Sequence, residues 1–169
     1  PAGHSLLMSL VLRDPPDLLP LAAGVAVARV AGPDARVKWP NDVVLVPDTG
    51  PLRKLAGILA EGRPQEGWAV LGIGLNVAVR VADLPPELHA TAASLERRPD
   101  EVPAVRDALL RELEAVFALD TAALLGELRE RDALRGRPVT WAEGSGRGGG
   151  IDGAGRLVVE LDGGGRTEL

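Results

Sequence analysis

Residues 54–77, KLAGILAEGRPQEGWAVLGIGLNV, predict two β-strands joined as a hairpin. Lys54–Glu61 and Trp68–Val77 are apolar runs, and Gly62–Gly67 between them contains turn-forming residues. In the second run two glycines and Asn76 recur at every second residue, so they share one face of the strand. That face carries few side chains, and a flat ligand could lie against it.

The residues before this hairpin predict a strand, a helix and two further strand pieces. Ser5–Arg13 is a short apolar run that we expect to form a buried strand. Leu18–Ala31 is apolar nearly all round, so we expect a well-buried helix with Asp17 as its cap and Pro20 in its first turn. The two strand pieces that follow are Arg36–Trp39 and Asp42–Val46.

The residues after the hairpin predict two helices and then a region of short strands. Val79–Pro99 is irregular, whereas Val102–Phe117 has apolar residues at helical spacing and Thr121–Leu134 forms a second expected helix. After Leu134 short strand-like pieces are separated by glycine, which indicates a small β-domain of barrel type. These pieces are Pro138–Trp141, Gly150–Asp152, Leu157–Leu161 and Arg166–Leu169.

Composition excludes several classes of site. The 169 residues are 46% hydrophobic and 25% charged, as expected for a soluble globular protein. The net charge of −5 argues against nucleic acid as the main partner, because phosphate binding needs clustered Lys and Arg. The absence of cysteine excludes disulfides, thiolate catalysis and cysteine-based zinc sites. No membrane span or signal peptide is visible, so we expect a cytoplasmic protein.

Lysine and asparagine are rare in this chain and gather in one region. Of the 19 basic residues only Lys38 and Lys54 are lysines, and the only asparagines are Asn41 and Asn76. A lysine retained where arginine is otherwise used suggests a site that needs a compact charge on a flexible stem. Residues 38–76 are therefore the candidate functional region.

The motif Lys38-Trp39-Pro40-Asn41-Asp42 places polar side chains on a rigid bend. Proline fixes its own φ and biases the residue before it toward an extended backbone. The asparagine side chain both donates and accepts, which suits an adenine or ribose edge, and the aspartate suits Mg²⁺. The same residue types also build an Asx turn beside a buried tryptophan, and the pattern does not separate the two interpretations.

The two strands of the hairpin each carry a candidate binding motif. Lys54 can project from its strand into a pocket and bind a carboxylate or phosphate, and Gly57 suggests close approach of a ligand. A solvent-facing lysine beside a packing glycine is the alternative. Gly72-Ile73-Gly74-Leu75-Asn76-Val77 lacks the third glycine and the helix of a dinucleotide site, so it is not a Rossmann motif. Its asparagine could contact phosphate or a metal-bound water, or the segment could be a tight strand crossing.

The glycine cluster Gly144–Gly150, GSGRGGG, resembles a phosphate loop only superficially. It lacks the Gly-Lys-Ser/Thr ending and no helix follows it. We therefore expect it to form a mobile hairpin turn.

Taken in order, KWPND, KLAGILAE and GIGLNV resemble the central domain of the biotin–protein ligases. The resemblance runs from about Gly3 to the end of the chain. SLLMSLVLR matches the strand before the family's buried helix, and GRPVTW…GIDGAGRLVVELDGG resembles its small C-terminal domain. The resemblance implies an α/β ligase core, a mixed sheet with helices, over residues 1–134. A small SH3-like β-barrel is expected over 135–169, and both domains are expected to be incomplete.

The family resemblance also implies a two-step, ATP-dependent reaction. Biotin carboxylate attacks the α-phosphate of ATP, giving biotinyl-5′-AMP and pyrophosphate, and a lysine on the biotin carrier domain of a carboxylase then attacks the mixed anhydride. The implied small molecules are ATP, biotin and Mg²⁺, and a homodimer stays open as the oligomeric state.

Residue by residue, the family's motifs map onto the three segments. The lysine of KLAG is the implied catalytic residue, here Lys54, whose cation offsets charge on the phosphoryl oxygens. The implied biotin-binding residues are Lys54, Gly57, Gly72 and Gly74. The implied nucleotide contacts are Lys38, Trp39, Asn41 and Asn76, and the implied Mg²⁺ contacts are Asp42 and Asn76.

The chain departs from the family pattern at its beginning. The family's Gly-Arg-Gly-Arg-x-x-Arg loop and the polar residues for the biotin ureido ring are expected upstream of residue 1, so weak or absent adenylation is expected. Two rivals follow. One is a lipoate-type acyl ligase of similar core fold, and the other is a non-catalytic remnant that binds the carrier domain.

Overall fold

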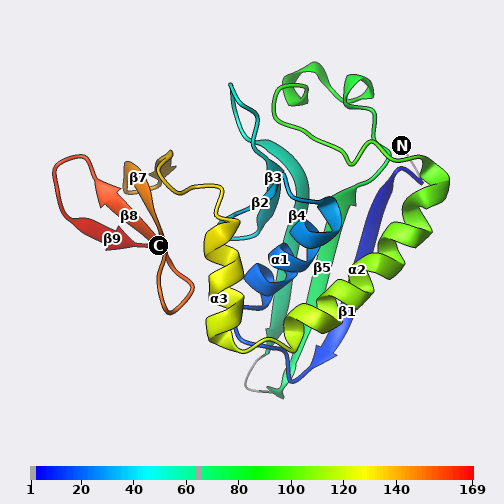
Figure 1. The fold of residues 1–169 in the computed structure, drawn as a ribbon, viewed down its shortest axis with the longest axis horizontal. Coiled ribbons are helices and arrows are strands. Elements are labelled where there is room, and N and C mark those ends of the chain that lie inside the picture. The colour runs from blue at the N-terminus through cyan, green and yellow to red at the C-terminus, as the bar shows by residue number, and fades with distance from the viewer. Residues whose placement is uncertain (1–2, 64–65) are drawn as a thin grey trace.

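The computed structural model describes residues 3–63 and 66–169, which form two sheets and three α-helices (Figure 1). The first sheet has the strand order β1-β5-β4-β3-β2 and the second β6-β7-β8-β9. Strands of the first sheet are β1 (Ser5–Arg13), β2 (Ala35–Lys38), β3 (Asp42–Leu45), β4 (Arg53–Arg63) and β5 (Trp68–Asn76). The second sheet contains β6 (Pro138–Trp141), β7 (Gly144–Ile151), β8 (Leu157–Leu161) and β9 (Arg166–Glu168). The α-helices are α1 (Leu19–Ala31), α2 (Val102–Phe117) and α3 (Thr121–Glu130), and short 3₁₀ helices lie at Val81–Asp83, Pro86–Leu88 and Pro99–Glu101.

The helices pack on one face of the first sheet and leave the other face open (Figure 1). Along β5 every second residue is buried, namely Ala69, Leu71, Ile73 and Leu75. The alternate residues Gly72, Gly74 and Asn76 lie on the opposite face, as the two-residue period predicts. The helix-covered face therefore holds the core, and the glycine-lined face is available to a ligand.

The expected mixed sheet is wrong for the described strands, because every pairing within the first sheet is antiparallel. The β4–β5 hairpin is confirmed, although residues 64–65 of its predicted connection lie outside the described residues. Only Trp39–Asn41 separates β2 from β3. A connection that short cannot make the crossover that parallel strands require.

β1 forms where predicted, but it is not a buried strand. Leu7 is 79% exposed and Val11 is 75% exposed, because β1 is an edge strand whose outer face no helix covers. Leu6 on the other face is buried against the core. A continuous apolar run does not reveal from sequence which of its two faces is covered.

Helix α1 is buried along most of its length, as its apolar composition predicts. Pro20 lies in the first turn as expected, but the expected cap at Asp17 is wrong. The N-cap residue is Leu18, which has a left-handed backbone with φ of 58° and provides no side-chain hydrogen bond. With Leu18 in this left-handed conformation, the helix begins at Leu19, one residue after the expected start.

The expectation that the cluster Gly144–Gly150 forms a mobile turn is wrong. Gly144–Ile151 is not a mobile turn but strand β7, paired with β6 and β8. A Cβ at Gly148 would overlap the carbonyl oxygen of Leu134, and one at Gly146 would overlap that of Glu160. Glycine is therefore needed here for close backbone packing. The sheet is not closed among the described residues, so the SH3-like barrel stays a prediction.

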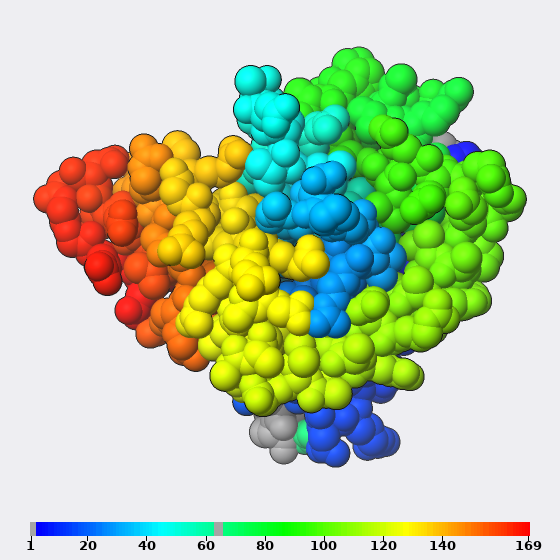
Figure 2. Space-filling model, viewed as in Figure 1, coloured from blue at the N-terminus to red at the C-terminus, as the bar shows by residue number. Residues whose placement is uncertain are grey.

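The segment after α3 covers the edge of the first sheet. Helix α3 ends at Glu130, before the expected Leu134, and the following residues pair with β2. Val37 N donates to Arg131 O at 2.8 Å, and Ala133 N donates to Val37 O at 2.9 Å. Figure 2 shows the C-terminal strands as a lobe beside α3. Among the described helices, none is long and apolar enough to cross a membrane.

Replacing Gly126 with alanine is expected to raise the free energy of unfolding by about 0.5–1 kcal/mol. Gly126 lies inside α3, and a Cβ there would meet nothing within 4 Å. Urea denaturation measures the change. The matched control is Gly136→Ala, which also has open space but has φ of 72° and should lose stability. Equal effects of the two changes would contradict this explanation.

Candidate functional site

A row of cross-strand partners runs over the open face of the first sheet. Lys38 pairs with Asp42, Asp42 with Gly57, Gly57 with Gly74, and Gly74 with Leu7. The row crosses all five strands and contains one or more residues from each of the three sequence motifs. Antiparallel register therefore brings together segments that lie 36 positions apart in the chain, from Lys38 to Gly74.

Two lysines meet one carboxylate in this row. Lys54 Nζ lies 2.6 Å from Asp42 Oδ1, and Lys38 Nζ lies 3.9 Å from Asp42 Oδ2. The Asp42 side chain is 18% exposed, whereas that of Lys54 is 54% exposed. A Cβ at Gly57 would lie 3.2 Å from Lys54 Nζ, so the missing side chain lets the lysine lie back across its own strand. Lys54 is thus held over the row but open to solvent and ligands.

Two adjoining cavities lie over the row, with volumes of about 460 and 550 Å³. They share Leu7, Asp42, Lys54, Gly57 and Gly74, so they form one groove with two ends. The first end adds Asn41 and Gly72, and the second adds Lys38 and Asn76. Each end has the volume of a small-molecule site, and the charged centre lies between them.

The two asparagines that line the groove are each fixed by a hydrogen bond to a backbone carbonyl. Asn41 Nδ2 donates to Ile58 O at 2.8 Å, and Asn76 Nδ2 donates to Ala93 O at 2.9 Å. Each amide nitrogen thus uses one of its two N–H donors on a backbone carbonyl. The second N–H can donate to a ligand oxygen, and Oδ1 can accept from a hydroxyl or bind a metal ion.

Trp39 does not line either end of the groove. It lines a third cavity of about 330 Å³ with Leu18, Pro20 and Leu59, and its Nε1 donates to Gly155 O at 3.1 Å. Asn41 lines both this cavity and the groove. A direct contact of Trp39 with a nucleotide stays a prediction.

The sequence reasoning missed the residues that wall the second end of the groove. These are Leu52, Leu84, Leu88, Thr91 and Ala92. The segment 79–99 is tied to the backbone of Lys54, since Lys54 N donates to Thr91 O at 2.6 Å and Ala93 N donates to Lys54 O at 2.8 Å. An irregular segment has no periodic pattern, so only its leucines signal that it covers something apolar.

Two residues at the second end offer oxygen atoms of the kind that hold Mg²⁺. The described residues contain no cluster of three or more metal-binding side chains. Asp42 and Asn76 nevertheless line the same cavity and offer one carboxylate and one amide oxygen. Mg²⁺ commonly takes one or two protein oxygens and completes its shell with phosphate and water.

The chain is similar in sequence to known proteins. The bifunctional ligase/repressor BirA of Escherichia coli (strain K12) is 34% identical over 166 residues, which cover 86% of this chain. The chain is a homologue of the biotin–protein ligases. BirA of Bacillus subtilis (strain 168) is 36% identical over 113 residues, or 59% of this chain. The homologue spans 49% of the length of the first relative and 33% of the second. No protein-family model matches it.

Solved structures show the same fold for this ligase homologue. Biotin protein ligase from Aquifex aeolicus, in complex with biotin and ATP, gives a TM-score of 0.75 at 23% identity. That match covers 98% of this chain and 75% of the other. A bipartite lipoate protein ligase from Thermoplasma acidophilum gives a TM-score of 0.50 at 18% identity, over 69% of this chain and 52% of the other.

Proposed function

We propose that this chain carries the substrate groove of a biotin–protein ligase, which forms biotinyl-5′-AMP from biotin and ATP and transfers biotin to a lysine of a carrier domain. The observation that carries the proposal is the row Lys38–Asp42–Gly57–Gly74, which joins the family's three motifs on one open face. The two ends of the groove suit the two halves of an adenylate.

Biotin lies at the first end of the groove in this proposal. Gly57, Gly72 and Gly74 leave a flat surface there, because none of them adds a side chain over the strands. Leu7 and Leu59 supply apolar contacts. The ligand's carboxylate then points toward the ammonium of Lys54, at the junction of the two cavities.

The nucleotide lies at the second end. Lys38 and Lys54 flank the α-phosphate, while Leu84 and Leu88 provide an apolar surface for the base. In the first step a carboxylate oxygen bonds to the α-phosphorus, and the bond to the bridging oxygen of pyrophosphate breaks. The fixed cations offset the charge that develops on the phosphoryl oxygens. Asp42 holds the Lys54 ammonium in place before substrate arrives.

Mg²⁺ would be held by the Asp42 carboxylate and Asn76 Oδ1, and it would supply charge neutralisation at the phosphates. In the second step the carrier lysine attacks the carbonyl carbon of the anhydride and AMP leaves. We assign residues 1–134 to the catalytic domain and 135–169 to the SH3-like domain in this proposal.

Calorimetric titration with a non-hydrolysable biotinyl-adenylate analogue tests the proposal. We expect one binding site per folded chain, and competition by biotin. Absence of heat and of competition from a chain whose circular dichroism shows it folded would contradict the proposed function.

A lipoate-type ligase is the second candidate. Its support is the structural similarity to the lipoate protein ligase, which is weaker than the similarity to the biotin protein ligase. A lipoyl-adenylate analogue in the same titration separates the two. Tighter binding of the lipoyl compound than of the biotinyl compound would favour the rival. Adenylate formed from ATP and biotin, detected by mass spectrometry, would exclude a purely non-catalytic role.

A further inference from the structure

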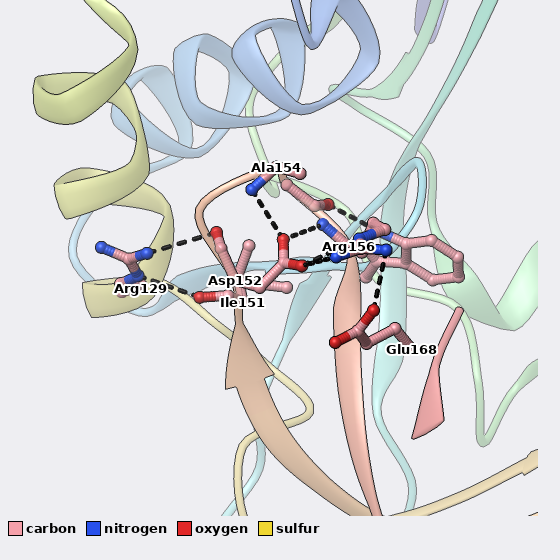
Figure 3. Close-up of polar contacts among 8 residues, drawn as sticks. Arg129, Ile151, Asp152, Ala154, Arg156 and Glu168 are labelled. Atoms are coloured by element: carbon pink, nitrogen blue, oxygen red, sulfur yellow. Dashed lines mark hydrogen bonds and ion pairs between the residues drawn. The ribbon is translucent and has the colours of Figure 1, made fainter. Parts of the chain in front are cut away.

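The Trp39 indole connects the first sheet to a turn of the second. Its Nε1 donates to the carbonyl oxygen of Gly155, 116 residues later in the chain. Helix α3 reaches the same turn, since Arg129 donates through Nε to Ile151 O at 3.0 Å and through a guanidinium nitrogen to Asp152 O at 3.2 Å (Figure 3). The turn is thus held by two elements outside its own sheet.

The turn itself is braced by Asp152, as Figure 3 shows. Asp152 Oδ1 accepts from Ala154 N at 2.8 Å and from Arg156 N at 2.9 Å, and Oδ2 accepts from Arg156 Nε at 2.8 Å. The backbone hydrogen bond from Arg156 is the main cause that lowers the pKa of Asp152. Arg156 also pairs with Glu168 of β9 at 2.7 Å. The Gly155 carbonyl is therefore presented by a pre-ordered loop.

Glycine is required where the turn meets α1. Gly155 has φ of 80°, and a Cβ there would lie 2.6 Å from Leu18 Cδ2. Gly153 in the same turn has open space within 4 Å and no positive φ. Close packing of the turn against Leu18 and Trp39 therefore depends on Gly155 and not on Gly153.

The bend that begins at Trp39 is also held on its other side. Asn41 exchanges two hydrogen bonds with the backbone of Ile58, at 2.8 Å from its side chain to Ile58 O and at 2.9 Å from Ile58 N to Asn41 O. Asp42 comes next and enters the row over the groove. The bend therefore lies between an anchor on β4 and an anchor on the second sheet.

We propose that the Asp152–Arg156 turn positions the Trp39–Asp42 bend, through the hydrogen bond from Trp39 to Gly155, and so sets the geometry of Asn41 and Asp42 in the groove. In this proposal Trp39 and Gly155 are positioning residues that act through the bend. The effect on ligand affinity rests on the proposed function, whereas the effect on the bend does not.

The test uses NMR of the ¹⁵N-labelled full chain without ligand, followed by titration with the biotinyl-adenylate analogue. Gly155→Ala removes the seating of the turn, and Trp39→Phe removes the donor while leaving the turn's backbone unchanged. Gly153→Ala is the matched control. The Trp39 indole resonance is identified by its loss in Trp39→Phe, and the β4 and β5 amide resonances report that the first sheet is folded.

In Gly155→Ala we expect faster exchange of the Trp39 indole proton and shifted Asn41 and Asp42 amide resonances. Each single variant should weaken analogue binding by about three- to tenfold, the range for one hydrogen bond. The affinity of the double variant should equal that of the single variant with the lower affinity, because both substitutions remove the hydrogen bond between Trp39 and Gly155. Gly153→Ala should leave all these signals and the affinity unchanged.

The proposal fails if the Asn41 and Asp42 resonances stay in place in both folded single variants, or if the two losses of affinity multiply in the double variant. If Gly155→Ala unfolds the second sheet, the result for Trp39→Phe alone decides whether the proposal holds. If even the unaltered chain does not bind the analogue, the proposed function fails, and the ligand-free spectra still decide whether the turn positions the bend.

Discussion

Lys54→Ala is expected to weaken binding of the biotinyl-adenylate analogue by about 10- to 100-fold, the range for loss of a hydrogen bond to a charged group. Lys54 Nζ lies at the junction of the two cavities, 2.6 Å from Asp42. Its side chain is 54% exposed, so solvent screening favours the lower part of that range. Calorimetric titration of the two proteins measures the ratio of dissociation constants.

The matched control for Lys54 is Arg53→Ala. Arg53 is the preceding residue of β4, carries the same charge and does not line either cavity. We expect its loss to change affinity by less than about twofold, as for a surface charge in high dielectric. Equal losses in the two variants would mean that only the overall charge matters. Unchanged affinity in a folded Lys54→Ala protein would remove Lys54 from the site.

Gly148→Ala is expected to lower the free energy of unfolding by about 2–4 kcal/mol, as severe overpacking does. Its Cβ would overlap the backbone of Leu134, which cannot move aside as a flexible side chain would. Gly149→Ala is the matched control, because its Cβ would make only ordinary contacts at 3.4 Å. Urea denaturation followed by circular dichroism measures the free energy of unfolding of each variant. Equal stability of the two variants would contradict the close packing.

These glycines also mark a part of the fold that the sequence did not predict. The strands β1, β6 and β8 and the helix α2 have the predicted bounds, because their apolar periodicity is a local property. The cluster Gly144–Gly150 has no side chains to give a period, so a strand that pairs closely with its neighbours looked like a turn. Its role depends on Leu134 and Glu160, and tertiary packing of that kind has no local signal.

The candidate site was predictable in part for a similar reason. The two-residue alternation placed Gly72, Gly74 and Asn76 on one face, and the structure has them there. Nothing local indicates that Gly57 pairs with both Asp42 and Gly74, since cross-strand register depends on the whole sheet. The contact of Trp39 with Gly155 was equally hidden, because it joins two sheets.

The most direct test of the proposed groove is a map of amide chemical-shift changes in the full chain as the biotinyl-adenylate analogue is added. We expect the largest changes at Asn41, Gly57, Gly72 and Gly74 for the biotin end, and at Lys38 and Asn76 for the nucleotide end. Gly149 and Gly153 of the second sheet should change little. Saturable binding whose shift changes lie away from the open face of the first sheet would contradict the assignment of the groove.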